Sequence, residues 1–318
     1  MEKVIAGVDL GGTNIKAGLV DGEGNVVSRC RIPTEAEGGP EAVTDRMADA
    51  VREAAAEGGT NIDSVAGVGV GSPGPLDLKT GEVIVAPNLP GWEHIPLQEM
   101  MAERTGLPCV LENDANAAAL AEQWAGAGKG ANSLVQLTLG TGIGGGIVLD
   151  GQVWHGFADC AGEIGHMSID PDGPKCNCGN WGCIEALASA TAMVRRMREE
   201  IENGTDTILA DKAEDLTARD IYEAALEDDE AAAENMHMTG FFLGVGITNL
   251  LHILNPEVVV LSGGVTAAGN MLLRPIRQTV RERTMEACRR DVKIRFAELG
   301  DDSGLIGAAR AFALRGGE

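Results

Sequence analysis

The chain has 318 residues, 44% of them hydrophobic, and its 48 acidic and 25 basic residues give a net charge of −23. A field this negative repels polyanions, so we expect neither nucleic acid nor an anionic membrane as a partner. No apolar run approaches the roughly 20 residues that cross a bilayer and the first residues show no leader pattern, which predicts a cytoplasmic protein. The length favours two domains.

The first part of the chain opens with short apolar segments separated by Gly-containing turns. The patterns predict strands at 4–9, 17–20, 26–32, 65–71 and 108–111. They predict helices at 40–57, 97–105 and 114–124, the last with Asn113 or Asp114 near its cap. Residues 72–92 are rich in turn signals and are expected to be loop.

A Gly-rich linker at 126–130 precedes a second set of alternating segments. Strands are predicted at 134–139, 145–149, 164–169, 258–261 and 292–296. Helices are predicted at 184–203, 218–226, 231–254, 271–287 and 304–314. Strands that alternate with helices, with a hairpin opening each half, favour two α/β domains around mixed sheets.

One Gly-rich pattern occurs twice, at a constant offset of 129 residues. Residues 7–22 read GVDLGGTNIKAGLVDG and residues 136–151 read QLTLGTGIGGGIVLDG, which aligns Asp9 with Thr138 and Gly11 with Gly140. Glycine lets backbone N–H groups approach an anion closely. A tight hairpin would explain a single copy, whereas the repetition predicts two cradles for nucleotide phosphates. No Walker motif is present, and each turn opens a hairpin where a dinucleotide site needs a helix.

The seven cysteines form an odd set that does not suggest a disulfide framework. His166, Cys176, Cys178 and Cys183 have the spacing H-x9-C-x-C-x4-C. Three thiolates and one imidazole suit a closed, tetrahedral structural Zn²⁺ site. Four protein ligands leave no open position, so this zinc is not expected to be the catalyst. The other cysteines are expected to be packed thiols.

Seven motifs occur in an order that resembles one known family: DLGGTNIK, SPGPLD, ENDANAAALAE, LTLGTGIGGG, AGEIGHM, CNCGNWGC and NPEVVVLSGG. The chain resembles the ROK family of sugar kinases and sugar-responsive repressors. The resemblance implies the two-domain actin/hexokinase-like (ribonuclease H-like) α/β ATPase fold with a cleft between lobes. It implies a small lobe of residues 1–117 and 304–318, completed by the C-terminal helix, and a larger lobe of 118–303 that contains the zinc loop.

The resemblance also implies an activity, ATP-dependent phosphorylation of a hexose, with glucose and its 6-hydroxyl preferred, by a homodimer. A helix N-terminal Asp is most often a cap, yet the resemblance makes Asp114 the base that deprotonates the sugar hydroxyl. The residues expected to hold the other sugar hydroxyls are Asn113, Glu163, His166 and Glu185. Phosphates are expected at Gly11, Gly12, Thr13, Gly140, Thr141 and Gly142, adenosine at Gly263 and Gly264, and Mg²⁺ near Asp9.

Other positions carry weaker expectations. Asn88 and Gly74 are candidates for the sugar wall, although turn formation alone would explain them, and Lys16 is expected to face solvent. His94, His155, His237 and His252 show no partner pattern and are expected to be structural or exposed.

Several alternatives stay open at this level. The acceptor could be N-acetylmannosamine, fructose or allose, and the donor ADP or polyphosphate. A sugar-sensing repressor would carry an N-terminal DNA-binding arm, whereas the first phosphate strand begins at Val4. A catalytically silent sugar-binding protein would be expected to lack Asp114 or the Gly-Gly-Thr turn. The acidic, Lys-poor composition, with only seven Lys, raises the further hypothesis of a saline cytoplasm.

Overall fold

A computed structural model describes residues 4–316, which form two compact units. Unit 1 comprises the described residues up to 134, residues 146–162, and those from 297 onward; unit 2 comprises residues 135–145 and 163–296. The lobe boundaries expected from the sequence, at 117/118 and 303/304, stay a prediction. Within residues 4–316, no helix combines the length and apolar character that a bilayer crossing requires.

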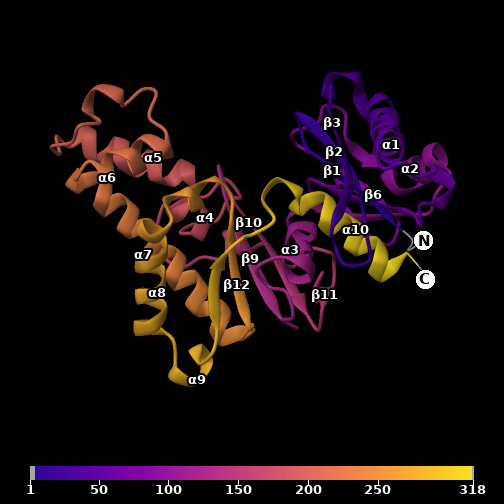
Figure 1. Cartoon of the computed structure of the whole chain (residues 1–318). Coiled ribbons are helices and arrows are strands. Elements are labelled where there is room, and N and C mark those ends of the chain that lie inside the picture. Colours follow the sequence, from indigo (N-terminus) through magenta and orange to yellow (C-terminus); the bar gives the residue numbers. More distant parts are fainter. Residues whose placement is uncertain (1–3, 317–318) are drawn as a thin grey trace. The chain divides into compact units, whose positions relative to one another are not determined.

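Unit 1 is built on a five-stranded mixed sheet whose strands are coloured indigo to magenta in Figure 1. In spatial order these are β3 (Val26–Pro33), β2 (Asn14–Val20), β1 (Ile5–Leu10), β4 (Val68–Ser72) and β8 (Cys109–Asn113). β1, β4 and β8 are parallel, whereas β2 is antiparallel to both β1 and β3. In this register Asp9 pairs with Gly71, and Gly71 pairs with Glu112. Asp9 and Glu112 therefore lie in one row near the carboxyl ends of the parallel strands.

Helices cover both faces of this sheet. They are α1 (Gly39–Glu57), α2 (Leu97–Thr105), α3 (Asp114–Ala125) and α10 (Ser303–Arg315). α1 packs on β2 and β3, whereas α10 packs on β1, β4 and α3. A Cβ at Gly7 or Gly69 would overlap the α10 backbone, and one at Gly307 would overlap the α3 backbone. These glycines allow α10 to approach both partners more closely than any side chain permits.

Residues 72–92, expected to be loop, contain two short strands of a separate three-stranded sheet. Its members are β5 (Leu76–Asp77), β6 (Glu82–Val85) and β7 (Glu93–Ile95). The sequence shows no strand pattern here, because β5 has only two residues and β6 only four, and neither shows an alternation of apolar and polar residues.

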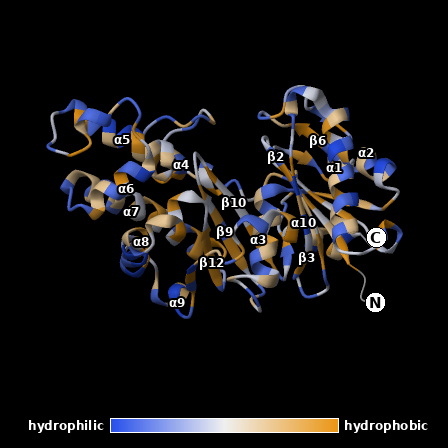
Figure 2. Cartoon of the chain, turned by 45° about the horizontal axis from the view of Figure 1, so that its top comes forward, coloured by the Kyte–Doolittle hydropathy of each residue, from blue (hydrophilic) through white to orange (hydrophobic). Residues whose placement is uncertain are grey.

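The second five-stranded sheet has the order β11-β10-β9-β12-β13. Its strands are β11 (Gln152–Val153), β10 (Ile143–Leu149), β9 (Leu134–Leu139), β12 (Val258–Ser262) and β13 (Lys293–Phe296). β9 and β12 are mainly hydrophobic in Figure 2, and Val135, Leu137, Val259 and Leu261 are fully buried. β13 lies at the edge of the sheet and has charged residues at alternate positions.

The helices of unit 2 are α4 (Ile184–Ala188), α5 (Ala190–Glu202), α6 (Ala218–Leu226), α7 (Glu230–Ile253), α8 (Asn270–Arg283) and α9 (Glu286–Arg289). α7 and α8 pack against each other, and Gly240 and Gly244 of α7 meet Pro275 and Thr279 of α8.

Three expectations for this half were wrong. Residues 164–169 do not form a strand, because a 3-10 helix, η3 (Ile164–His166), turns the chain there, with Gly165 against the backbone of Ile143. The helix expected at 184–203 is interrupted at Ser189, whose hydroxyl caps α5 by accepting from the N–H of Ala192. The helix expected at 271–287 ends at Arg283, since Thr284 is extended.

Candidate active site and metal cluster

The first Gly-rich turn joins β1 and β2 as the hairpin that the sequence predicted. The Gly11 N–H donates to the Asn14 carbonyl at 3.0 Å, and the Thr34 hydroxyl donates to the Gly11 carbonyl at 2.6 Å. Gly12 and Thr13, at the tip of the turn, are exposed. A backbone hydrogen bond and the side chain of Thr34 therefore hold the shape of the turn and leave its tip open to a ligand.

Asp9, at the end of β1, lies beside this turn. Its carboxylate is 3.7 Å from Lys16 Nζ, and it fills the space where Gly304 of α10 has no side chain. Burial raises the pKa of Asp9 above its ordinary value, while the charge of Lys16 opposes this rise. Lys16 also donates to the Asp301 carbonyl, so the expectation of a solvent-facing lysine was wrong.

The junction of β8 and α3 positions Asn113 and Asp114. Asn113 is the cap: its Oδ1 accepts from the N–H groups of Ala115 and Asn116, and its amide donates to the Gly74 carbonyl. Asp114 is the first helical residue, and its carboxylate is exposed and accepts from the Ala115 N–H at 2.8 Å. Because Asn113 fills the capping role, capping does not account for Asp114.

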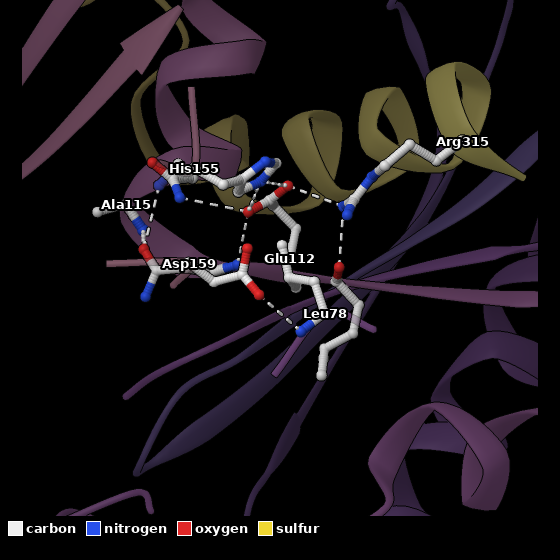
Figure 3. Close-up of polar contacts among 9 residues, drawn as sticks. Leu78, Glu112, Ala115, His155, Asp159 and Arg315 are labelled. Carbon is white, nitrogen blue, oxygen red and sulfur yellow. Dashed lines mark hydrogen bonds and ion pairs between the residues drawn. The ribbon is translucent and has the colours of Figure 1, made fainter. Parts of the chain in front are cut away.

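The residue of β8 before this junction is Glu112, a fully buried carboxylate at the centre of the polar contacts in Figure 3. It accepts from Nε2 of His155 at 2.9 Å and from Arg315 of α10 at 2.8 Å. It also accepts from the backbone N–H of Asn113 at 3.0 Å and the side chain of Asn116 at 3.3 Å. Glu112 thus fixes the last residue of β8 and the first turn of α3 relative to α10.

The second Gly-rich turn joins β9 and β10 in unit 2. Glu185 of α4 accepts from the Ile143 N–H at 2.9 Å and lies where a Cβ on Gly142 would be. The start of α5 supports the other side, since the Ala190 N–H donates to the Gly140 carbonyl and the Thr191 hydroxyl to the Thr141 carbonyl. Thr141 itself is exposed.

A cavity of about 350 Å³ adjoins this turn. Its polar and turn-forming wall contains Gly140, Thr141, Arg219, Glu223 and Gly264, and its apolar wall contains Ala190, Met193, Ala218, Tyr222, Met236, Val265, Ala267 and Ala268. Gly263 has a φ of 88° and sits against the backbone of Leu139, which brings the end of β12 beside the end of β9. A cavity of this size, with a mainly apolar lining beside a Gly-rich turn, has the size and chemistry for a nucleoside with its phosphates at the turn.

Four potential metal ligands gather in the same unit, since the ligand atoms of His166, Cys176, Cys178 and Cys183 all lie within 4.8 Å of one another. Cys178 Sγ is 3.7 Å from Cys183 Sγ, and Cys176 Sγ is 3.6 Å from His166 Nδ1. Around a tetrahedral Zn²⁺ with ordinary bond lengths, two sulfurs lie about 3.8 Å apart and a sulfur and nitrogen about 3.6 Å. The donor set and its spacing therefore fit zinc.

The cluster orients the side chains expected at the sugar. Nδ1 of His166 faces the thiols, and its Nε2 lies 3.9 Å from a carboxylate oxygen of the exposed Glu163. This separation is too long for a direct hydrogen bond. Nε2 of His166 and the carboxylate of Glu163 can therefore each form a hydrogen bond with a hydroxyl group of a ligand. Glu185 connects the cluster to the second Gly-rich turn, because its second carboxylate oxygen is 3.7 Å from Cys176 Sγ.

The candidate residues divide between the two units. Unit 1 contains Asp9, the first turn, Asn113 and Asp114, and unit 2 contains the second turn, the cavity beside it and the Cys/His cluster. Sequence reasoning missed Glu112, Arg315 and the role of His155. The sequence offered one signal for this network, the acid that opens ENDANAAALAE. The partners themselves could not be found, because Glu112 lies 43 residues from His155 and 203 from Arg315.

Comparison with known proteins yields consistent matches along the chain. Residues 5–314 match the model of the ROK family. A glucokinase from Halalkalibacterium halodurans is 40% identical over 305 residues, which is 95% of this chain and 92% of the relative. A ROK hexokinase from Thermus thermophilus superposes with a TM-score of 0.84 at 36% identity over 99% of both chains. A Streptomyces griseus ROK glucokinase, solved with glucose and AMPPNP, gives 0.76 at 35% over 96% of this chain and 98% of its own. This chain, with the two-domain actin/hexokinase-like fold, belongs to the ROK family.

Proposed function

We propose that this protein transfers the γ-phosphoryl group of ATP to the 6-hydroxyl of glucose. The observation that carries the proposal is the intact Asn113–Asp114 junction in a chain that is 35% identical to a glucokinase with glucose and AMPPNP bound. The relatives named glucokinase cover nearly the whole chain, which supports the same chemistry.

Each unit supplies one set of groups to the proposed reaction. Asp114 takes the proton of the attacking hydroxyl, and Asn113, Glu163, His166 and Glu185 bind the other hydroxyls of the sugar. The turns at Gly11–Thr13 and Gly140–Gly142 bind phosphates, and the cavity beside Gly263 and Gly264 takes the adenosine. Transfer needs the acceptor oxygen in line with the γ-phosphorus, so the residues act mainly by positioning.

Two metals belong to the proposal. Asp9 would hold Mg²⁺, which neutralises phosphate charge when bound. His166, Cys176, Cys178 and Cys183 would hold a structural Zn²⁺, and the cation would keep Nε2 of His166 pointed at the sugar. Because ATP and hexose are the substrates, we place the reaction in the cytoplasm. We also propose a homodimer, which light scattering tests.

A donor and acceptor panel tests the function. Purified protein is assayed with glucose, fructose, allose and N-acetylmannosamine, each with ATP, ADP and polyphosphate, and the ADP or sugar phosphate formed is coupled to a change in NADPH or NADH. We expect the highest kcat/KM for glucose with ATP. A higher kcat/KM for another sugar would change the assigned substrate. The absence of turnover with every combination of donor and sugar would reject the proposed kinase activity.

Two single cysteine substitutions test the zinc site. We expect Cys178→Ser to lose one equivalent of zinc by elemental analysis and to raise the KM for glucose, because His166 loses its anchor. Cys288→Ser, at a half-buried cysteine of the same unit outside the cluster, is the control and should keep the metal. A wild-type protein that contains no zinc and is fully active would refute the assignment.

A further inference from the structure

A basic hollow lies in unit 2, separate from the nucleoside cavity. It has a volume of about 350 Å³ and is lined by Arg277, Arg281, Arg289, Lys293 and Arg295, over a floor that includes Val280 and Ile294. We name these five basic residues the basic cluster. No residue that lines the nucleoside cavity also lines this hollow.

The cluster departs from the charge pattern of the whole protein. Residues 274–295 contain eight of the 25 basic residues but only three acids, in a chain of net charge −23. Some arginines elsewhere in the chain form ion pairs with carboxylates, as Arg29 does with Asp302 and Arg46 with Glu35. Within residues 4–316, Arg277, Arg281, Arg289 and Lys293 have no carboxylate within ion-pair distance.

Three elements converge to form the hollow. Arg277 and Arg281 lie one turn apart on α8, Lys293 and Arg295 share one face of β13, and Arg289 ends α9. Arg277 is fixed by donating to the Ile294 carbonyl at 2.9 Å. The buried Nε of Arg289 has no hydrogen-bond partner among the described residues. A buried donor of this kind is costly unless a ligand or water accepts from it.

A structural explanation accounts for only part of this arrangement. Charged residues on an edge strand such as β13 prevent unwanted strand pairing, which explains Lys293 and Arg295. It does not explain Arg277 and Arg281 on the facing helix, or the orphaned Nε of Arg289. The positive charges around the hollow repel each other, which destabilises the folded protein. A bound anion would replace this repulsion with attraction.

We propose that the basic cluster binds a small anion that carries at least two phosphate groups. Guanidinium groups recognise phosphate through paired, charge-assisted hydrogen bonds. The hollow has the size of a small-molecule site and exceeds the needs of a single phosphate. Nucleic acid is a poor occupant because the rest of the protein would repel a long polyanion. The site lies outside the residues assigned to glucose and ATP.

Calorimetric titration with inorganic tripolyphosphate, with the nucleotide site already saturated by a non-hydrolysable ATP analogue, tests the proposal. We compare the wild type with Arg281→Gln/Arg289→Gln and with the control Arg274→Gln/Arg283→Gln, which removes two charges from the same region outside the hollow. The cluster variant should bind tripolyphosphate about tenfold or more weakly, because each lost charge-assisted hydrogen bond is worth about that factor. The control should bind like the wild type, and orthophosphate should bind the wild type more weakly than tripolyphosphate.

Activity and size measurements separate this site from the others. Both double variants should keep the kcat and the KM for ATP of the wild type, which shows that the fold and nucleotide site are intact. Equal tripolyphosphate affinity in all three proteins would overturn the proposal, as would an equal loss in the control. If light scattering showed that only the cluster variant changes its oligomeric state while tripolyphosphate affinity stayed constant, the cluster would instead be an interface between copies.

Discussion

Two adjacent residues at the start of α3, Asn113 and Asp114, have different roles. Asn113 satisfies the N–H groups of Ala115 and Asn116, and Asp114 presents an exposed carboxylate one residue later. Since the cap is provided by a different side chain, Asp114 can be changed without removing it. Its role can therefore be tested apart from the stability of α3.

We expect Asp114→Asn to lower kcat by about 10²–10⁴-fold, because the amide cannot accept the proton of the sugar hydroxyl. Glucose affinity should stay within a few-fold of the wild type, since the amide keeps the shape of the side chain. Steady-state kinetics and glucose calorimetry measure the two effects. The control is Asp63→Asn, at an exposed acid of the same unit. A variant that kept most of its kcat would show that another group is the base.

The buried Glu112 supports this junction, and we expect Glu112→Ala to destabilise the protein by about 3 kcal/mol. The loss leaves Arg315 and His155 without their carboxylate in a largely buried setting. Urea unfolding measures the free energy, and the double variant Glu112→Ala/Arg315→Ala should be less destabilised than the sum of the single changes. Glu199→Ala breaks an exposed pair with Arg195 and should cost about 0.5 kcal/mol or less. Strict additivity would mean that Glu112 and Arg315 do not stabilise each other.

At the scale of elements, α10 depends on glycine in the strands beneath it. Gly69 of β4 faces the backbone of Ala308, whereas Gly71 of the same strand has only ordinary contacts, the nearest at 3.6 Å from a hypothetical Cβ. A methyl group at Gly69 must push α10 away from the sheet, because a backbone oxygen cannot rotate aside.

We therefore expect Gly69→Ala to destabilise the protein by about 2–3 kcal/mol and Gly71→Ala by clearly less. Both changes replace glycine by alanine in the same strand, so the effect of β propensity is the same in the two variants. The difference between their stabilities therefore reports the contact with α10. Thermal and urea unfolding of both variants provide the measurement. Equal losses at the two positions would contradict close packing as the reason for glycine at 69.

Elements with a regular apolar pattern could be predicted from the sequence. The helices Leu97–Thr105 and Ala218–Leu226 and the strand Leu134–Leu139 have the predicted bounds, and both Gly-rich turns join strands as expected. The errors occur where one side chain or glycine outweighs periodicity, as at Ser189 and Gly165. The Cys/His cluster could be predicted because its ligands are close in sequence. The Glu112 network could not, because tertiary folding joins its members.

At the scale of the whole molecule, the excess of acids is the dominant electrostatic feature. With 48 acidic and 25 basic residues, and only seven of the latter Lys, the folded chain repels itself at neutral pH. The local exception at residues 274–295 is too small to offset a net charge of −23. Salt should therefore stabilise this protein by screening.

We expect the melting temperature to rise by roughly 5 °C or more between low and molar KCl, because the Debye length falls from about 30 Å at 0.01 M to about 3 Å at 1 M. Screening is strongest at the first additions of salt, so most of the gain should come before the molar range. KCl and NaCl should act alike, and sucrose, which is uncharged, should not reproduce the early rise. Calorimetric scans at fixed protein concentration and pH measure the curve. A melting temperature indifferent to molar salt would remove both self-repulsion as a limit on stability and the hypothesis of a saline cytoplasm.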